Sequence, residues 1–364
     1  MQVNYLLLDH KTYFSHLSHY RAQVMQDMVR GLVRRRDVRL SALALCLTGE
    51  AQHDSHIRQL NRFLKACPVK QAEMVPFILS ALELDNQPLH LILDRTNWMA
   101  RKGHPINVFM ISVRYKDSSV PLYHELLDKD GSSNQQERID IFERFFTVLD
   151  PSRVANLTAD REFIGRQWFK YLKNKNIAFD IRIRKNATVK VGGVECKAWE
   201  LFKHACRGKH LRLKQKCEIH GQTVYLSGHY RRAKKSEKTK KGKRDYFILA
   251  SSSTANQGRK RYAKRWKIEQ MFKDLKSSGF HMKRSGLFLA ERFSQLLNVV
   301  SIAYILVLKV GYREAEANPN LVKKLKHGRR RKSIFRLGLG TVLKRLEQLL
   351  NHYLSQTYGE VSCT

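Results

Sequence analysis

Short apolar runs alternate with amphipathic stretches over residues 88–183, and this alternation restricts the possible folds more than any other feature. Several of the runs are rich in β-branched and aromatic residues, which predicts strands at residues 89–94, 108–115, 120–126, 154–160 and 177–183. Apolar side chains at helical spacing predict helices at residues 134–149 and 166–173. Neighbouring strands followed by alternating strand and helix are typical of a mixed α/β sheet.

The charge of the chain is strongly unbalanced. The 364 residues include 68 Lys and Arg but only 32 Asp and Glu, which gives a formal net charge of +36. Such a chain repels itself unless a polyanion neutralises it, and nucleic acid is the commonest such partner. We therefore expect a nucleic-acid-binding protein; a basic protein of another kind, ribosomal or bound to a membrane surface, is the alternative.

The N-terminal residues and the apolar runs indicate in which cellular compartment the protein is expected. The first ten residues lack a basic region and a long apolar core, so we expect no secretory signal. The longest uncharged apolar run, Phe293–Leu308, is shorter than the roughly 20 residues that span a bilayer, and it predicts a buried helix. We therefore expect the protein in the cytoplasm.

The six cysteines, at positions 46, 67, 196, 206, 217 and 363, form no Cys-x-x-Cys pair, and a reducing compartment would leave them as free thiols. Three of them lie near His204, His210 and His220, which leaves structural zinc as an alternative, although the spacings do not match known zinc ligands.

Two amphipathic helices are predicted near the N-terminus, at residues 18–33 and 54–66. The second carries Arg58, Arg62 and Lys65 opposite its apolar side chains. A helix-turn-helix would place these cations in a DNA groove. A plain helical hairpin with a solvated basic face explains the same pattern, and the sequence leaves both open.

Changes of pattern divide the chain into five predicted segments. The second and fourth form the predicted α/β core, and the fourth contains a long helix. The segments are a helical DNA-binding region (1–85), the first part of the core (86–184), a β-rich basic insertion (185–244), the second part of the core (245–320) and a basic helical C-terminal region (321–364). Between residues 231 and 244, nine residues are Lys or Arg, and we expect this run to meet DNA phosphates.

The most informative residues lie on a predicted helix over 256–276. Tyr262, Arg265, Glu269 and Lys276 fall within about 60° of one another around a regular helix. A carboxylate beside cations and a phenol suits a metal-dependent phosphodiester site, since the carboxylate binds a divalent ion and the cations hold phosphate oxygens. A surface helix with ion pairs four residues apart is the alternative explanation.

Two aspartates strengthen the catalytic interpretation, because each ends a predicted apolar strand. Asp94 ends the first strand and Asp160 ends a later one. An acid in a strand core is costly, whereas one at the mouth of the strand points into a cleft. Two strand-end acids and Glu269 can share metal ions. Glu162, two residues after Asp160, is the competing choice for the second acid.

The chain resembles the DDE transposases of bacterial insertion sequences, in the cut-and-paste branch marked by Tyr-x2-Arg-x3-Glu-x6-Lys. Tyr262, Arg265, Glu269 and Lys276 match this signature in residue type and spacing, and the order of segments matches along nearly the whole chain. The resemblance implies an α/β fold with a ribonuclease-H-like mixed sheet core, a mainly β insertion and helical N-terminal and C-terminal regions.

The resemblance also implies a function. Asp94, Asp160 and Glu269 would be the catalytic triad and would bind two Mg²⁺ ions, with Mn²⁺ as a possible substitute. The partners would be double-stranded DNA, as terminal inverted repeats and as target, and a second copy of the chain in a homodimer. The DNA-binding residues would be Tyr262, Arg265, Lys276, Tyr246, Arg58, Arg62 and Lys65.

Excision in this family passes through a DNA hairpin, for which an aromatic residue, often Trp, stacks on a flipped base. Tyr246 stands at that place here, and stacking needs only a π face. Two other functions remain open: a nuclease or resolvase on the same core that cuts without joining, and a non-catalytic DNA-binding regulator.

Overall fold

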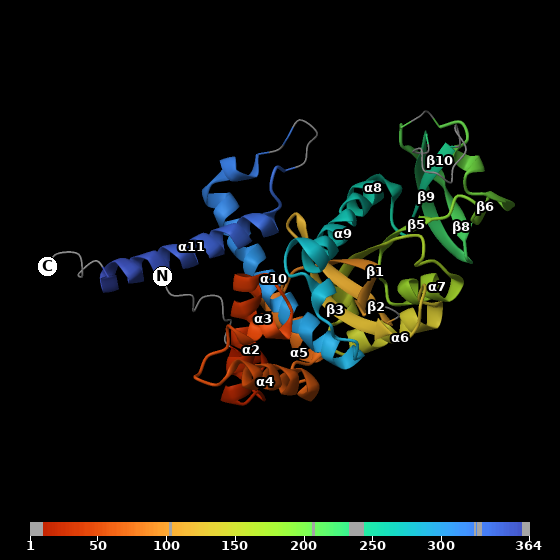
Figure 1. Cartoon of the computed structure of the whole chain (residues 1–364). Coiled ribbons are helices and arrows are strands. Elements are labelled where there is room, and N and C mark those ends of the chain that lie inside the picture. The colour runs from red at the N-terminus through yellow and green to blue at the C-terminus, as the bar shows by residue number, and fades with distance from the viewer. Residues whose placement is uncertain are drawn as a thin grey trace. The chain divides into compact units, whose positions relative to one another are not determined.

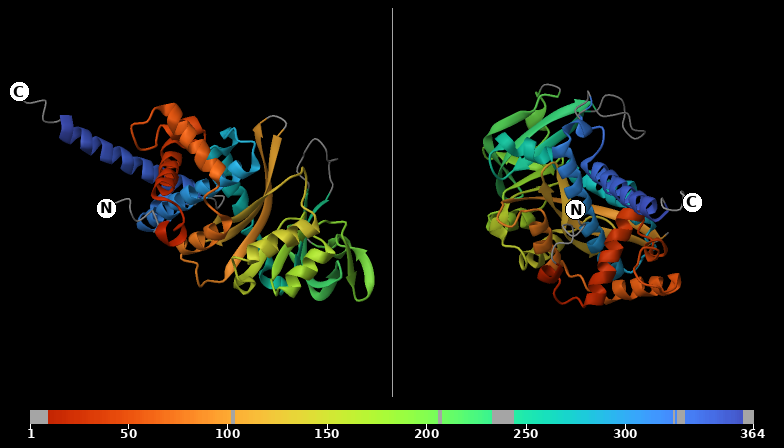
Figure 2. Two further views of the ribbon diagram at one scale, coloured as in Figure 1. Left: turned by 90° about the horizontal axis from the view of Figure 1, so that it is seen from below. Right: turned by 90° about the vertical axis from the view of Figure 1, so that its left-hand side faces the viewer.

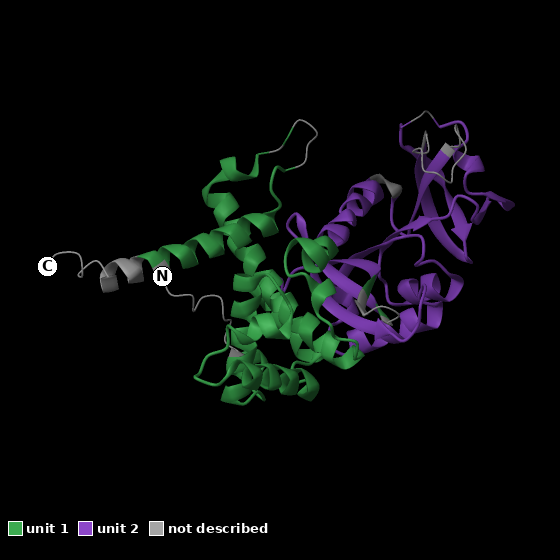
Figure 3. Cartoon of the chain, viewed as in Figure 1, with its two compact units in different colours: residues 1–83, 97–106, 271–364 green, residues 84–96, 107–270 purple. Residues whose placement is uncertain are grey.

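The computed structural model describes residues 10–101, 104–205, 208–232, 244–323, 325 and 330–358. The chain forms two compact units (Figure 3). Unit 1 consists of residues 1–83, 97–106 and 271–364, and unit 2 consists of residues 84–96 and 107–270. The units divide the chain in space, so they do not test the five segments predicted along the sequence.

A ten-stranded sheet is the main feature of unit 2 (Figure 1). Its strands lie in the order β3-β2-β1-β4-β5-β10-β9-β8-β6-β7. Their bounds are β1 Leu89–Arg101, β2 His104–Tyr115, β3 Ser118–Leu127, β4 Val154–Ala159, β5 Phe179–Ile183, β6 Thr188–Val191, β7 Val194–Lys197, β8 Leu211–Ile219, β9 Gln222–Arg232 and β10 Arg244–Ser251. The outer ends of β1 and β2 belong to unit 1.

The first five strands form a mixed sheet. β2 and β3 are antiparallel, whereas β1 pairs with β4, and β4 with β5, in parallel. The parallel pairs require crossover connections, which the helices after β3 and β4 supply. The prediction of a mixed α/β fold with a ribonuclease-H-like core and helical ends is confirmed by this order and these directions.

Helices cover the two faces of the sheet in unit 2. The ring of Phe179 in β5 packs on Phe169 of α7 (Arg166–Asn174), while the next residue, Asp180, binds Arg261 of α8 (Ala255–Ala263). Because successive strand residues point to opposite faces, α7 and α8 lie on opposite sides. Figure 2 shows α6 (Gln135–Phe146) beside α7 on the same side.

The predicted β-rich insertion is confirmed, and its strands extend the central sheet. β10 pairs with β5 on one side and with β9 on the other, so β9, β8, β6 and β7 continue outward from the core. Short 3-10 helices, η2 (Pro151–Arg153) and η3 (Glu200–Phe202), lie in the connections. Of the basic run at 231–244, residues 233–243 lie outside the described part of the chain.

Unit 1 is built from helices. Their bounds are α1 His10–Tyr13, α2 His19–Arg35, α3 Leu40–Ala44, α4 His53–Ala66, α5 Gln71–Ala81, α10 Ala290–Ala317 and α11 Ile334–Tyr358, with short turns η5 Met282–Arg284 and η6 Pro319–Val322. The helices predicted at 18–33 and 54–66 correspond to α2 and α4. α11 lies within the predicted helical C-terminal region, and its first turns are buried through Ile334, Phe335, Leu337 and Leu339.

α10 is the central helix of unit 1. It packs against α2, α4, α5 and α11. It is long and apolar enough to cross a membrane, yet 89% of its most apolar stretch is buried inside the protein. Its polar side chains are paired there, since Gln295 and Asn298 donate to the carbonyl of Val69. The prediction of a buried helix at 293–308 is therefore confirmed.

Two predicted boundaries around the candidate site were wrong. β1 continues to Arg101, so Asp94 lies inside the strand instead of at its end. The helix predicted over 256–276 is broken at Lys264–Arg265 into α8 and α9 (Trp266–Lys273), and it ends in a π-helical turn, η4 (Asp274–Ser278). The break is a tight turn, in which Arg265 N–H donates to the Tyr262 carbonyl and Ile268 N–H to the Arg265 carbonyl.

Candidate active site

The two aspartates predicted for the site are neighbours across β1 and β4. Leu93 of β1 pairs with Ala159 of β4 as the last pair of the parallel ladder. Asp94 is the next residue of β1, and Asp160 directly follows the end of β4; adjacent strands lie about 4.8 Å apart. Although β1 continues, Asp94 stands where its pairing with β4 ends, so the strand register brings the two acids next to each other.

The backbone orients both carboxylates in the same way. The N–H of Arg95 donates to Asp94 Oδ1 at 2.8 Å, and the N–H of Arg161 donates to Asp160 Oδ1 at 2.7 Å. Each aspartate thus has one oxygen held by the backbone of the following residue.

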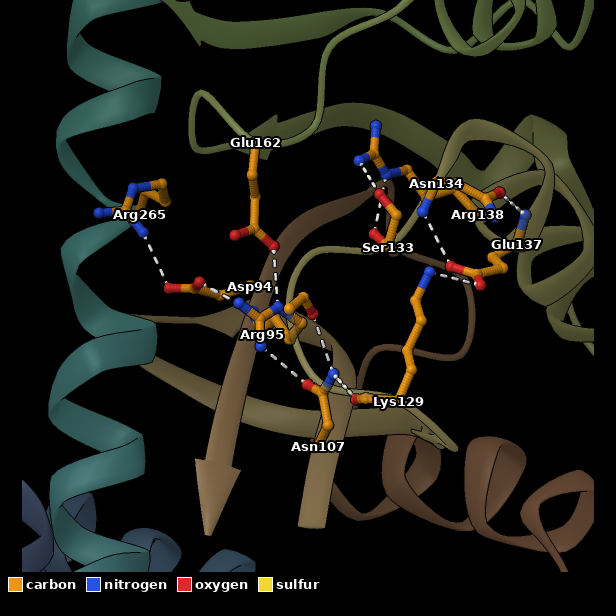
Figure 4. Close-up of polar contacts among 11 residues, drawn as sticks. Asp94, Arg95, Asn107, Lys129, Ser133, Asn134, Glu137, Arg138, Glu162 and Arg265 are labelled. Atoms are coloured by element: carbon orange, nitrogen blue, oxygen red, sulfur yellow. Dashed lines mark hydrogen bonds and ion pairs between the residues drawn. The ribbon is translucent and has the colours of Figure 1, made fainter. Parts of the chain in front are cut away.

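Arg265 joins the first aspartate to the glutamate. Its Nη1 donates to Asp94 Oδ2 at 3.0 Å and its Nη2 to Glu269 Oε1 at 2.5 Å (Figure 4 shows the contact with Asp94). The Arg265 side chain is only 10% exposed. One guanidinium between two carboxylates places the strand acid and the helix acid around a common cation.

The electrostatics extend this cluster to Asp160. Burial alone would lower the pKa of Arg265, but Tyr262, Asp94, Asp160 and Glu269 together raise it above its ordinary value. The guanidinium is therefore permanently charged and lies in the field of all three predicted acids.

Burial raises the pKa of Asp94 from 3.8 to about 6. Arg265 and the Arg95 N–H oppose this rise, while the nearby carboxylates of Glu162 and Glu269 add to it. Asp94 is thus hard to ionise without a cation close by.

Tyr262 lies under the same guanidinium. Its ring centroid is 5.7 Å from the Arg265 guanidinium carbon, and Phe247 packs edge-on against the ring at 5.3 Å. Burial raises the pKa of the Tyr262 hydroxyl to about 12, with a further contribution from Asp160. The hydroxyl is accordingly neutral at physiological pH and can donate a hydrogen bond.

Glu162, the competing choice for the second acid, also lies beside this cluster. Its Oε1 is 3.4 Å from Arg95 Nε, and Arg95 Nη1 donates to Asn107 Oδ1 at 2.9 Å (Figure 4). Asn107 in turn donates to the carbonyls of Lys129 and Gly131. Glu162 is therefore held by an arginine, whereas Asp160 follows directly from the β4 register.

The sequence analysis did not identify Arg95 and Asn107, which hold Glu162 beside the site. Arg95 directly follows Asp94, so its position beside the site was readable, but Asn107 comes from another strand and carries no local signal. Trp266 was also overlooked; it is 60% exposed and directly follows Arg265, which is unusual for so large an apolar side chain.

Lys276, the last residue of the signature, lies in unit 1. Its Nζ donates to the Asn97 carbonyl at 3.0 Å and stands 5.3 Å from the Trp98 ring centroid and 5.8 Å from that of Phe272. The cation rests on an aromatic surface formed by β1 and α9.

Tyr246 packs inside the inserted part of the sheet. It is 8% exposed, and its ring centroid lies 6.2 Å from Trp199 and 6.0 Å from Tyr230. The neighbouring Phe247 points to the opposite face, toward Tyr262. Base stacking by Tyr246 would require its ring to leave these contacts.

The predicted cations of the N-terminal region line one face of α4. Arg58, Arg62 and Lys65 are exposed, while Leu60, Phe63 and Leu64 of the same helix are buried. The amphipathic pattern thus gives a basic helix face that is free to meet a ligand.

The chemistry of the acids fits a divalent cation. Hard oxygen ligands suit Mg²⁺, and Asp94 and Glu269 already converge on one positive charge. With Arg265 between the acids, no group of three or more His, Cys, Asp and Glu side chains in the described part of the chain is close enough to hold an ion. A metal would therefore replace the guanidinium between the carboxylates. The same finding gives no support to zinc at the described cysteines.

Three comparisons with known proteins complete the description. No curated protein sequence matches the chain significantly. Among solved structures, the cryo-EM structure of the piggyBac transposase synaptic complex with hairpin DNA is similar, with 13% identity and a TM-score of 0.44, over 96% of this chain and 76% of that chain. The family model of the transposase DDE domain matches residues 86–306, which include Asp94, Asp160 and Glu269. The chain therefore belongs to the family of proteins with a transposase DDE domain.

Proposed function

We propose that this transposase excises an insertion sequence at its terminal inverted repeats and joins it to target DNA in a metal-dependent reaction. The observation that carries the proposal is the meeting of Asp94 and Glu269 on Arg265, with Asp160 next to Asp94 in the strand register. The acids come from three distant parts of the chain, and structural ion pairing alone does not require all three.

In the proposed reaction Asp94, Asp160 and Glu269 would hold two Mg²⁺ ions, or Mn²⁺ in their place. Such ions would supply the positive charge that activates an attacking water or 3′-hydroxyl and stabilises a leaving oxygen. Arg265 leaves the carboxylates and binds a DNA phosphate, so its charge is retained in the site. Tyr262 donates a hydrogen bond from its neutral hydroxyl, and Lys276 adds a further positive charge.

The same site would carry out every strand step in turn: nicking of the first strand, hairpin formation, hairpin opening and strand transfer. The hairpin step includes stacking of a flipped base on Tyr246. That role requires Tyr246 to move out of its contacts with Trp199 and Tyr230 when DNA binds.

DNA binding would use the basic surface of the chain. The net charge of +36 and the exposed face of α4, with Arg58, Arg62 and Lys65, supply phosphate contacts. Two transposon ends must be cut together, for which a homodimer is proposed. The proposed cleavage and joining of DNA would take place in the bacterial cytoplasm.

The proposal is tested with a labelled transposon end, a target plasmid and Mg²⁺. The wild-type protein is expected to give both nicked and joined products, and Glu269→Ala is expected to lose both while it still binds the end. Glu125→Gln, which removes a carboxylate paired with Arg144 outside the site, is the control and should keep both activities.

Two other outcomes identify the alternative functions. Nicked ends without joined products would identify a nuclease or resolvase. Equal behaviour of the wild type and Glu269→Ala, with DNA binding and no cleavage in either, would identify a regulator. Asp160→Asn and Glu162→Gln decide the second acid: the proposal expects cleavage to be lost in the first and kept in the second.

A further inference from the structure

A buried ion pair holds Arg261, which directly precedes Tyr262 and lies four residues before Arg265. Asp180 of β5 is fully buried, and its carboxylate accepts four hydrogen bonds. The donors are Arg261 Nε at 2.5 Å, Ser251 Oγ at 2.6 Å, Asn156 Nδ2 at 3.0 Å and Arg261 Nη2 at 3.1 Å. Arg261 Nη2 also donates to Ser253 Oγ at 3.1 Å. Both carboxylate oxygens are thus fully satisfied.

The helix comes very close to the sheet at this point. A Cβ atom on Gly258 of α8 would lie 2.5 Å from Ser251 Oγ and 2.6 Å from Asp180 Oδ1. Gly258 and Arg261 are three residues apart, so they share one face of α8. Only glycine permits this approach. The short distance allows Arg261 to donate to Asp180 through both Nε and Nη2 of its guanidinium.

Backbone hydrogen bonds connect Arg261 directly to the turn that carries Arg265. Arg261 accepts a backbone hydrogen bond from Lys264, and Tyr262 accepts one from Arg265, both at about the length of a regular helical bond. These bonds form the tight turn between α8 and α9. A shift of Arg261 would therefore move Arg265 relative to Asp94, whose position depends on β1 and β4.

The free-energy cost of burying Asp180 and Arg261 indicates that this ion pair serves geometry more than stability. Burying two charges costs most of what their attraction contributes, and well-packed apolar pairs of similar volume are often as stable or more stable. Nonpolar contacts would hold α8 on the sheet equally firmly, but they would fix its rotation and its position along the axis less narrowly than a bidentate pair does.

We propose that Asp180 and Arg261 are positioning residues, which set the rotation and axial position of α8 so that Arg265 reaches both Asp94 and Glu269. The inference rests on the proposed function and deepens it. Neither residue needs to touch DNA or metal, because both act through the turn that carries Arg265.

The decisive variant replaces both charges together, Asp180→Leu with Arg261→Met. We expect it to fold with a lower Tm, because the buried donors of Asn156 and Ser251 lose their acceptor, and to bind transposon ends with wild-type affinity. Its cleavage rate at saturating DNA should fall roughly 100-fold, as expected for a displacement of about 1 Å in an active site, with little change in KM. The matched control, Glu125→Gln with Arg144→Gln, removes an ion pair between β3 and α6 and should cleave at the wild-type rate.

Two further variants keep the test decisive if the double variant fails to fold. Arg261→Lys keeps the charge but loses the two parallel N–H donors of the guanidinium. Its cleavage rate should therefore lie between those of the wild type and the double variant. Gly258→Ala changes no charge but pushes α8 away from the sheet, and it should also slow cleavage. Wild-type cleavage in the double variant, or in both of these, would overturn the proposal.

Hydrogen exchange separates this proposal from the proposed function. In the double variant, amides of α8 and α9 should exchange at least tenfold faster, while those of β5 and β10 stay protected. If the wild-type protein cleaves no DNA with any divalent metal, the proposed function fails, and the exchange result still decides the positioning role. Unchanged exchange over residues 257–273 would refute it.

Discussion

At the scale of single residues, Arg265 explains how the site can be stable without a metal. It places one positive charge between Asp94 and Glu269, which would otherwise repel each other in a poorly solvated position. The same side chain then competes with any metal ion for these carboxylates. A side-chain arrangement that stabilises the metal-free protein therefore opposes metal binding.

Arg265→Gln tests this competition. Removal of the guanidinium should tighten Mn²⁺ binding about tenfold, since a charge-assisted hydrogen bond contributes about 1.5–3 kcal/mol, while cleavage should be lost. Mn²⁺ titration followed by electron paramagnetic resonance measures the affinity, with Arg144→Gln as a control. Weaker metal binding in Arg265→Gln would show that the arginine assists the metal instead of competing with it.

The pKa of Asp94 makes the stability of the metal-free protein depend on pH. Because the folded-state pKa is raised from 3.8 to about 6, the folded protein binds the proton more tightly than the unfolded chain. This contribution to the free energy of unfolding is full below about pH 4 and is lost as the pH rises through about 6.

Denaturant unfolding in EDTA, at several pH values, measures the effect. Relative to Asp94→Asn, the wild type should lose up to about 3 kcal/mol of stability between about pH 4 and 6. A difference between the two proteins that is constant over this range would show that the Asp94 pKa is not raised.

At the scale of elements, register and helix geometry bring the site together. The parallel pairing of β1 with β4 makes Asp94 and Asp160 neighbours. Arg265 lies in the tight turn between α8 and α9, and its side chain is within hydrogen-bonding distance of Glu269, four residues later. α4 presents a separate basic face, on which Arg58, Arg62 and Lys65 are exposed.

The α4 face can be tested by Arg58→Gln, Arg62→Gln and Lys65→Gln in one variant. If these residues contact phosphates, the slope of log affinity against log salt should fall by about 2 to 3. The free energy of unfolding should change by less than about 0.5 kcal/mol, since the side chains are exposed. Arg166→Gln with Lys170→Gln on α7 is the control; an equal loss in both variants would mean that α4 has no special role.

At the scale of the whole molecule, the net charge of +36 leads us to expect DNA binding that is dominated by phosphate contacts. Each phosphate contact releases counterions, so affinity for transposon ends should fall at least about 1,000-fold between about 50 and 200 mM salt. Fluorescence anisotropy with a labelled end measures this directly. Affinity that is indifferent to salt would remove the electrostatic part of the proposal.

Much of the architecture was readable from local sequence. The strands and helices of residues 88–183 follow from apolar periodicity, and the burial of α10 follows from its length and its polar residues. Errors occurred where distant segments decide the outcome: β1 extends past Asp94 because its outer half belongs to unit 1, and the helix predicted over 256–276 breaks at Lys264–Arg265.

The sequence by itself determined the types and the spacing of the catalytic candidates, because periodicity and charge are local properties of the chain. Only the tertiary structure decided that Arg265 lies between two carboxylates, that Tyr246 is packed away from Tyr262, and that Asp180 holds Arg261. Those contacts depend on strand register and on the direction of side chains from segments far apart in the sequence, which no local pattern encodes.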